Sequence, residues 1–193
     1  RGFPCDLGIR GSAGTALPLL EEAMASREKS AKSRIDARRA KIAGIKGDQA
    51  AANQARIDKI ASGTAAMDNA WVAHCLNQVK QDEDILISES QLALGNIALR
   101  EPGSFFGTSP SGGLGWGLGA SHGVKLGQQD KRVFCVVGDG AYMFGNPTPA
   151  HFVSAAYNLP VLTVIMNNKM WGSVRKATLG LYPEGAASSA NQA

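Results

Sequence analysis

The chain has 193 residues, of which 44% are hydrophobic, and this supply of apolar side chains is enough to form a core in one or two domains. No apolar run approaches the length of a membrane-spanning helix, and residues 1–6 do not follow the pattern of a secretory signal peptide. The three cysteines share no metal-ligand spacing, and their odd number favours a reducing compartment. We therefore expect a cytoplasmic protein without a membrane partner.

The first 25 residues predict a short strand over 5–9 and a helix over 15–24. Two such elements cannot enclose a core by themselves, so we expect them to expose apolar surface. The chain also lacks an initiator methionine and opens in the middle of a pattern. We therefore expect it to be part of a longer protein.

The net charge of +4 is unevenly distributed along the chain. Residues 26–60 contain ten Lys or Arg against four Asp or Glu. This asymmetry raises nucleic-acid binding as one hypothesis. The stretch has no aromatic residue for base stacking and no groove-reading motif, so it favours a solvated connector and no nucleic-acid partner. We expect this connector to be helical or partly disordered and to be interrupted at Gly44 and Gly47.

Two apolar segments, residues 133–137 and 161–166, are rich in β-branched side chains and predict buried parallel strands. A helical pattern over residues 148–158 lies between them and completes a β-α-β unit. One polar cluster follows each strand: Gly138-Asp139-Gly140 after the first and, 26 residues further on, Asn167-Asn168 after the second. In open parallel sheets the carboxyl ends of the strands form the edge at which ligands bind.

The side chains of the two clusters are those of one class of site. Gly138 and Gly140 are expected to let the backbone turn tightly and to let an anion approach the amides. Asp139 offers one hard carboxylate and Asn168 one amide oxygen. With phosphate oxygens, these groups form a typical partial shell for Mg²⁺, so the sequence predicts a diphosphate held through a divalent metal.

The runs 138–144 and 167–172 resemble the motif of thiamine diphosphate-dependent enzymes, and are close to the acetolactate synthase-like and benzoylformate decarboxylase-like branch. The resemblance covers about residues 65–185. It implies an α/β fold, a doubly wound parallel sheet with helices on both faces, incomplete at its C-terminus. It also implies three parts: residues 1–25 as the end of a central α/β domain, 26–63 as a basic linker, and 64–193 as the diphosphate-binding domain.

The same resemblance implies site residues. Asp139, Asn168 and the Met170 carbonyl match the family's protein ligands to Mg²⁺. The implied contacts to thiamine diphosphate are Gly112, Gly113, Leu114, Gly138, Gly140, Ala141 and Trp171.

Two residues of the glycine-rich segment match positions that act on the cofactor's rings. The Gly112 carbonyl would accept a hydrogen bond from the 4′-amino group, and Leu114 would hold the cofactor in a V shape. Glu89 follows a predicted strand at 84–87 and is expected only to lie near the diphosphate or to cap the next helix.

The activity implied by the resemblance is Mg²⁺- and thiamine diphosphate-dependent cleavage or formation of a C–C bond in 2-keto acids or related acyl donors. No residue here takes a catalytic role, because the family's activating glutamate belongs to an N-terminal domain, usually of a partner subunit. The full-length form is expected to be at least a dimer, and the isolated chain to be inactive. FAD is compatible with this branch, but its site would belong to the central domain.

Two other readings of the chain stay open. It could be the separate diphosphate-binding subunit of a split thiamine diphosphate enzyme. It could also be a non-enzymatic module whose basic stretch, residues 26–60, binds nucleic acid.

Overall fold

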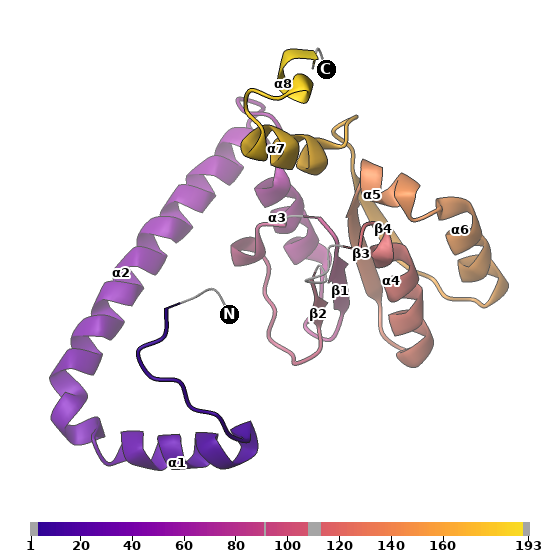
Figure 1. Ribbon diagram of the computed structural model, residues 1–193. Coiled ribbons are helices and arrows are strands. Elements are labelled where there is room, and N and C mark those ends of the chain that lie inside the picture. The colour runs from indigo at the N-terminus through magenta and orange to yellow at the C-terminus, as the bar shows by residue number, and fades with distance from the viewer. Residues whose placement is uncertain (1–3, 91, 108–112, 191–193) are drawn as a thin grey trace. The chain divides into compact units, whose positions relative to one another are not determined.

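The computed structural model describes residues 4–90, 92–107 and 113–190 (Figure 1). The chain divides into two compact units, Arg1–Arg56 and Ile57–Ala193, and each is described by itself. Within the described residues, no helix is both long enough and apolar enough to cross a membrane.

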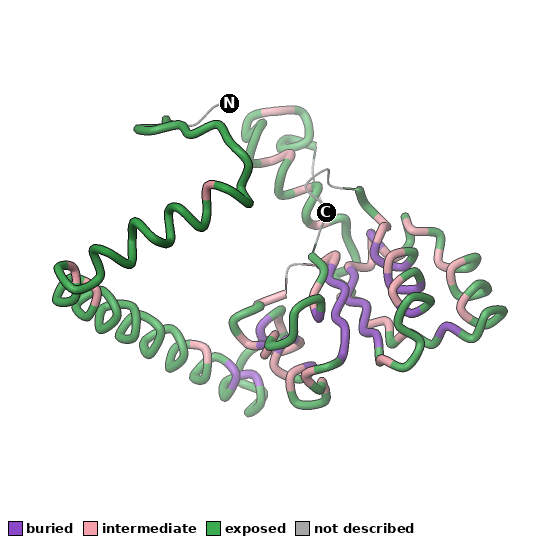
Figure 2. Tube along the Cα trace, turned by 90° about the horizontal axis from the view of Figure 1, so that it is seen from below, coloured by how far each residue is buried: buried purple, intermediate pink, exposed green. Residues whose placement is uncertain are grey.

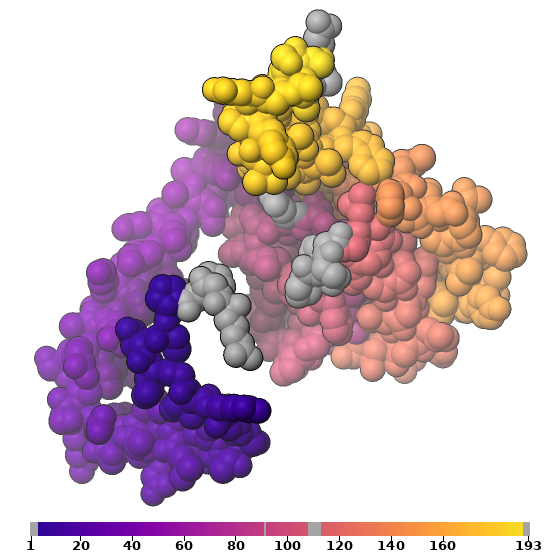
Figure 3. Space-filling model, in the orientation of Figure 1, coloured from indigo at the N-terminus to yellow at the C-terminus, as the bar shows by residue number. Residues whose placement is uncertain are grey.

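The first unit contains helix α1 (Ala13–Ala25) and most of helix α2 (Glu28–Ala61). The strand predicted over residues 5–9 is wrong, because the described residues 4–12 form no strand. A lone strand has no neighbour to pair with, and Leu7 and Ile9 are exposed instead. The side chains of α1, in indigo, lie at the visible surface in Figure 3, and none of its residues is buried. The expected exposure of apolar surface in this segment is confirmed.

Helix α2 runs without a break through Gly44 and Gly47, so the predicted interruptions at these residues are wrong. A glycine inside a helix costs only about 1 kcal/mol relative to alanine, and the flanking residues are mostly strong helix formers. Neither glycine has a positive φ angle. On the exposed surface of the helix, the Asp36 carboxylate forms ion pairs with Lys32 and Arg39, with N···O distances of 3.3 and 3.8 Å.

The second unit is built on a sheet of four parallel strands. In chain order these are β1 (Ile85–Ser88), β2 (Phe105–Phe106), β3 (Val133–Gly138) and β4 (Leu162–Met166), and in the sheet their order is β2-β1-β3-β4. Strands β3 and β4 pair in parallel along their length, which confirms the predicted β-α-β unit. The helical elements of this unit are α3 (Asn69–Val79), η1 (Leu94–Asn96), α4 (Trp116–Gly127), α5 (Asp139–Phe144), α6 (Pro147–Ala156), α7 (Gly172–Leu181) and α8 (Ala186–Ala190).

Helix α3 covers one face of the sheet. Because successive side chains of a strand point to opposite faces, alternate residues of β1 and β3 share this side. Leu86 and Phe134 pack here against Ala73 and Leu76 of α3 in one buried cluster. The buried positions of the second unit concentrate along these strands in Figure 2.

Helix α4 covers the opposite face. Ile87 and Val133 pack with Val124 of α4, and Cys135 packs with Leu118 of the same helix. Burial raises the pKa of the Cys135 thiol to about 11, so this residue is a small core hydrophobe, as expected. The predicted fold class, a parallel sheet wound with helices on both faces, is therefore confirmed.

Strand β4 lies at the end of the sheet, with β3 on one side. Within the described residues no further strand pairs with its other side. Leu162 and Ile165 are 56% and 41% exposed, so the prediction of a buried strand is correct for β3 and wrong for β4. The composition of a strand sets its hydrophobicity, whereas its burial depends on which elements cover it.

An ion pair between the buried Asp84 and the half-exposed Arg132 fixes the start of β1 against the start of β3. The Asp84 side chain is 1% exposed and accepts hydrogen bonds from Nε of Arg132, at 2.9 Å, and from the amide of Gln81, at 2.7 Å. The Arg132 guanidinium also lies 5.7 Å from the centre of the Phe134 ring. Burial acts to raise the pKa of Asp84, but the hydrogen bonds from Arg132 and Gln81 outweigh it and lower the pKa below its usual 3.8.

We predict that Asp84→Asn lowers the free energy of unfolding at pH 7 by about 2 kcal/mol, because the amide loses one of the charged hydrogen bonds. Urea denaturation measures this change. Asp82→Asn is the matched control, since Asp82 forms an exposed pair with Arg100 at 3.1 Å and its loss should cost less than about 1 kcal/mol. Equal losses in the two variants would contradict the structural role of Asp84.

The same pair predicts a pH dependence of stability. The pKa of Asp84 is lower in the folded state than in the unfolded state. The contribution of Asp84 to the free energy of unfolding is therefore complete above about pH 3.8 and is lost as the pH falls further. The gap in unfolding free energy between wild type and Asp84→Asn should therefore narrow from pH 6 to pH 3. A gap that stays constant over this range in urea titrations would show that Asp84 has an unshifted pKa.

Candidate functional site

A cavity of about 730 Å³ lies in the second unit, where β1, β3 and β4 end. Gly138 of β3 pairs with Met166 of β4, so the residues that follow these two strands leave the sheet side by side. The loop after β1 reaches the same edge. The polar wall of the cavity includes Glu89 and Ser90 after β1, Asp139 after β3, and Asn167 and Asn168 after β4.

The structure brings together every predicted site residue that it describes. Gly112 lies outside the described residues, so its predicted role stays a prediction. The other nine all line the cavity: Gly113, Leu114, Gly138, Asp139, Gly140, Ala141, Asn168, Met170 and Trp171.

Asp139 is the first residue of α5, and the chain passes from strand to helix without a separate turn. Its Oδ1 accepts a hydrogen bond from the amide of Gly140 at 2.9 Å. Neither Gly138 nor Gly140 has a positive φ angle, so this change from strand to helix does not use the left-handed conformation that glycine allows. Gly140 lies against the ring of Trp171, and a Cβ at this position would lie 3.4 Å from that ring.

The segment after β4 is shaped by its own asparagine side chains. Oδ1 of Asn167 accepts from the amide of Lys169 at 2.9 Å, and Oδ1 of Asn168 accepts from the amide of Met170 at 3.0 Å. Lys169 has a φ of 59°, a left-handed conformation. A Cβ on Gly172 would lie 2.8 Å from Nδ2 of Asn168, so a side chain at this position would displace the Asn168 amide group. These contacts fix the orientation of the Asn168 amide group.

Trp171 connects the loop after β4 to helix α5. Its ring lies against Gly140 and meets the Phe144 ring edge-on, with the ring centres 6.1 Å apart and the planes at 83°. Edge-on aromatic pairs contribute about 1 kcal/mol beyond their buried area. The two polar clusters of the cavity are thus held together by an aromatic contact as well as by the sheet.

Sequence reasoning expected Glu89 only to lie near the diphosphate or to cap the next helix, and the structure places it in the wall of the cavity. Its Oε1 accepts from the amide of Gly115 and its Oε2 from the amide of Gly117, the latter at 2.7 Å. Glu89 therefore caps α4, which is the next α-helix in the chain although it starts 27 residues later, after η1 and β2. Its place after β1, at the same sheet edge as Asp139, is the signal that could have identified it. Met67, Asp68 and Asn69 also line the cavity, and no motif marked them.

The glycine-rich segment before α4 is positioned by close backbone contacts. Gly115 has a φ of 85°, and a Cβ there would lie 2.7 Å from backbone atoms of Gly145. A Cβ on Gly117 would lie 2.9 Å from Oε2 of Glu89. Three segments therefore meet at this wall: the loop after β1, the start of α4 and the end of α5.

The polar atoms of the cavity suit a hard cation that shares its shell with a ligand. Within the described residues, no group of three or more His, Cys, Asp or Glu could hold a metal ion. A cation in this cavity would combine the Asp139 carboxylate with the Asn168 amide oxygen, the Met170 carbonyl and oxygens of a ligand. Mg²⁺ is commonly bound in this way, through one or two protein carboxylates and phosphate oxygens. The residues present fit that group.

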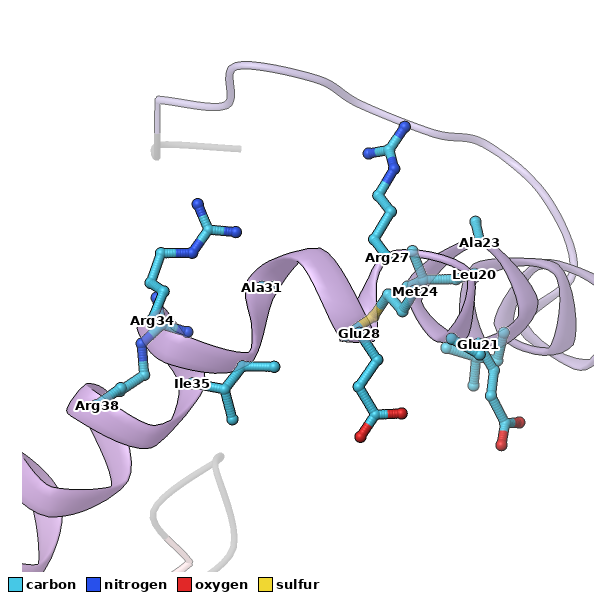
Figure 4. Close-up of a pocket in the computed structure, with 12 residues that line it drawn as sticks. Leu20, Glu21, Ala23, Met24, Arg27, Glu28, Ala31, Arg34, Ile35 and Arg38 are labelled. Carbon is cyan, nitrogen blue, oxygen red and sulfur yellow. The ribbon is translucent and has the colours of Figure 1, made fainter.

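A second cavity, of about 700 Å³, lies in the first unit between α1 and α2 (Figure 4). Leu20, Met24 and Ile35 contribute aliphatic side chains to it, and Arg27 and Arg34 contribute cations. It contains none of the predicted site residues. Leu20 and Met24 are exposed, as expected for an apolar helix surface without a cover.

Known proteins with similar sequences and structures share this domain. Benzoylformate decarboxylase of Pseudomonas aeruginosa is 37% identical over 79 residues, which are 41% of this chain and 14% of that protein. A probable acetolactate synthase large subunit of Methanococcus aeolicus is 33% identical over 73 residues, 38% of this chain and 12% of that protein. The structure of the thiamine diphosphate-dependent 4-hydroxybenzoylformate decarboxylase of Rhodococcus jostii RHA1 matches 63% of this chain and 23% of that one, with 30% identity and a TM-score of 0.56.

The matched stretches are therefore small parts of these relatives, at most about a quarter of their length. A family profile described as thiamine pyrophosphate enzyme, C-terminal TPP binding domain, matches residues 87–192. Thiamine pyrophosphate is another name for thiamine diphosphate. The match spans more than half of the chain and includes both polar clusters, so the predicted resemblance is confirmed: the chain belongs to the thiamine pyrophosphate enzyme family, of which it carries the C-terminal cofactor-binding domain.

Proposed function

We propose that the protein binds thiamine diphosphate and Mg²⁺ in the cavity at the carboxyl edge of its sheet, and uses them to cleave or form a C–C bond in a 2-keto acid or related acyl donor. The observation that carries the proposal is the convergence of Asp139, Asn168 and Met170 in one cavity with the glycine-rich wall that bears Leu114. Membership of the family supports the cofactor, and the names of the matched relatives support the reaction class.

The diphosphate would lie at the polar end of the cavity. Asp139 keeps acceptor capacity beyond its bond to Gly140, because a carboxylate offers about four lone-pair sites. The Asn168 amide oxygen and the Met170 carbonyl would complete the protein's share of the Mg²⁺ shell. The amides of Gly140 and Ala141 would support the phosphate oxygens, with Trp171 beside them.

The rings of the cofactor would lie along the other walls. Gly113 and Leu114 line this part of the cavity, and Met67, Val72 and Val164 add apolar surface to it. Leu114 is 36% exposed and is not part of the buried core, so its side chain is available for a ligand. We assign Leu114 the role of shaping the bound cofactor, as its position in the motif implies.

Thiamine diphosphate supplies, when bound, a nucleophilic carbon that adds to a carbonyl and accepts the negative charge left by C–C cleavage. The residues of this chain would bind and orient it. The group that activates its pyrimidine ring would come from another domain, in an assembly of at least two chains. Residues 1–25 would then be the end of a central domain, 26–63 a linker, and 64–193 the diphosphate-binding domain.

We predict that Asp139→Asn in the full-length protein weakens thiamine diphosphate binding about 10–100-fold, because one charged metal ligand is lost. Isothermal titration calorimetry in Mg²⁺ and then in EDTA measures this effect. EDTA should weaken binding to the wild type and change little in the variant. Asp130→Asn is the matched control, since Asp130 is exposed and lies outside the cavity.

Wild-type protein that is folded and binds no thiamine diphosphate in Mg²⁺ would overturn the proposed function. Equal affinities of wild type and Asp139→Asn would leave the cofactor in place and reject the assignment of Asp139 to the metal.

A further inference from the structure

We propose that Glu89 is a positioning residue: its carboxylate holds the glycine-rich wall of the cavity in place and so sets the space that Leu114 leaves for the rings of the cofactor. This inference rests on the proposed function and adds a residue to it. The sequence motif assigns nothing to Glu89.

Glu89 is itself firmly anchored to the sheet. Its amide donates a hydrogen bond to the carbonyl of Val136 at 2.9 Å, which continues the β1–β3 ladder one residue beyond Ser88. The side chain therefore projects from a fixed point at the carboxyl end of β1. Its partners, Gly115 and Gly117, are 26 and 28 residues away in sequence, so the carboxylate joins two segments that the chain does not connect locally.

The two bonds need both oxygens of a carboxylate. One oxygen accepts from Gly115, the residue immediately before α4, and the other accepts from Gly117, in the first turn of that helix. A neutral glutamine has one acceptor oxygen, and its NH₂ group would face an N–H donor at the other position. The carboxylate is also favoured at the N-terminal end of a helix.

The space around this contact leaves little freedom. A Cβ on Gly117 would lie 2.9 Å from Oε2 of Glu89 and 3.1 Å from Cγ1 of Val137. On the other side, a Cβ on Gly115 would overlap the backbone of Gly145. The start of α4 is therefore held between the carboxylate and the end of α5.

The contact acts on one end of the cavity. Leu114 precedes Gly115 directly, so a shift of Gly115 moves Leu114 and the ring wall. Asp139 and Asn168 follow β3 and β4, and their hydrogen bonds are to their own neighbours Gly140 and Met170. Loss of the Glu89 contact should disturb the ring end and leave the diphosphate end intact.

The test compares two probes in the full-length protein with Mg²⁺: thiamine diphosphate, which fills both ends, and inorganic pyrophosphate, which fills the diphosphate end. In calorimetric titration, Glu89→Gln should weaken thiamine diphosphate binding about tenfold. Pyrophosphate should bind as well as before or slightly better, since the variant removes a negative charge. Glu101→Gln, on an exposed turn outside the cavity, is the matched control and should change neither affinity.

Gly117→Ala provides a second variant that keeps the carboxylate and its charge. Its added Cβ should displace the Glu89 carboxylate. The variant should therefore also bind thiamine diphosphate more weakly and bind pyrophosphate as well as the wild type does. A role in stability alone would lower both affinities by the same factor in both variants, and that result would overturn the proposal. Unchanged thiamine diphosphate binding in both variants would also overturn it.

Failure of the proposed function gives a different result. Wild-type protein that binds neither thiamine diphosphate nor pyrophosphate would reject the cofactor site, and the role of Glu89 with it. If the wild type binds both probes and neither variant changes the affinity for thiamine diphosphate relative to that for pyrophosphate, only the role of Glu89 is rejected.

Discussion

The parallel pairing of β1, β3 and β4 is the constraint on which the site depends. The register sets Gly138 opposite Met166, and it carries Asp139 and Asn167 off the sheet at the same level. The continuation of β1 through Glu89 adds a third segment at that edge. A slip of one residue would turn each strand's side chains to the opposite face and separate the clusters. The Asp84–Arg132 pair, at the other end of β1 and β3, stabilises this register far from the cavity.

Glycine serves this site mainly by allowing close approach. Gly140 meets the Trp171 ring, Gly172 meets the Asn168 amide, and Gly115 meets the backbone of Gly145. Only the last of these also needs a positive φ angle. These glycines therefore stand where two segments pack closely without a side chain between them.

The sequence predicted the parts of the fold that local composition controls. Residues 133–137 and 161–166 could be identified as strands because each is an uncharged run rich in β-branched side chains. The polar clusters at their ends then fall at one edge. Glu89 could not be assigned, because its partners lie far along the chain and only folding reveals them. The exposure of β4 depends on neighbouring elements, and the continuity of α2 depends on many small propensities that together outweigh two glycines.

Glu89 and Asp139 are two of the carboxylates that line the cavity, and their hydrogen bonds suit them to different tasks. Each carboxylate oxygen of Glu89 already accepts a hydrogen bond from a backbone amide. The negative charge of Glu89 is therefore balanced by protein N–H groups in the glycine-rich wall. Asp139 accepts one such bond, from the residue beside it, and keeps capacity for a cation. A second uncompensated carboxylate would repel a diphosphate from the cavity. The amides of Gly115 and Gly117 offset that charge, so the protein can place a rigid anionic contact in an anion-binding site.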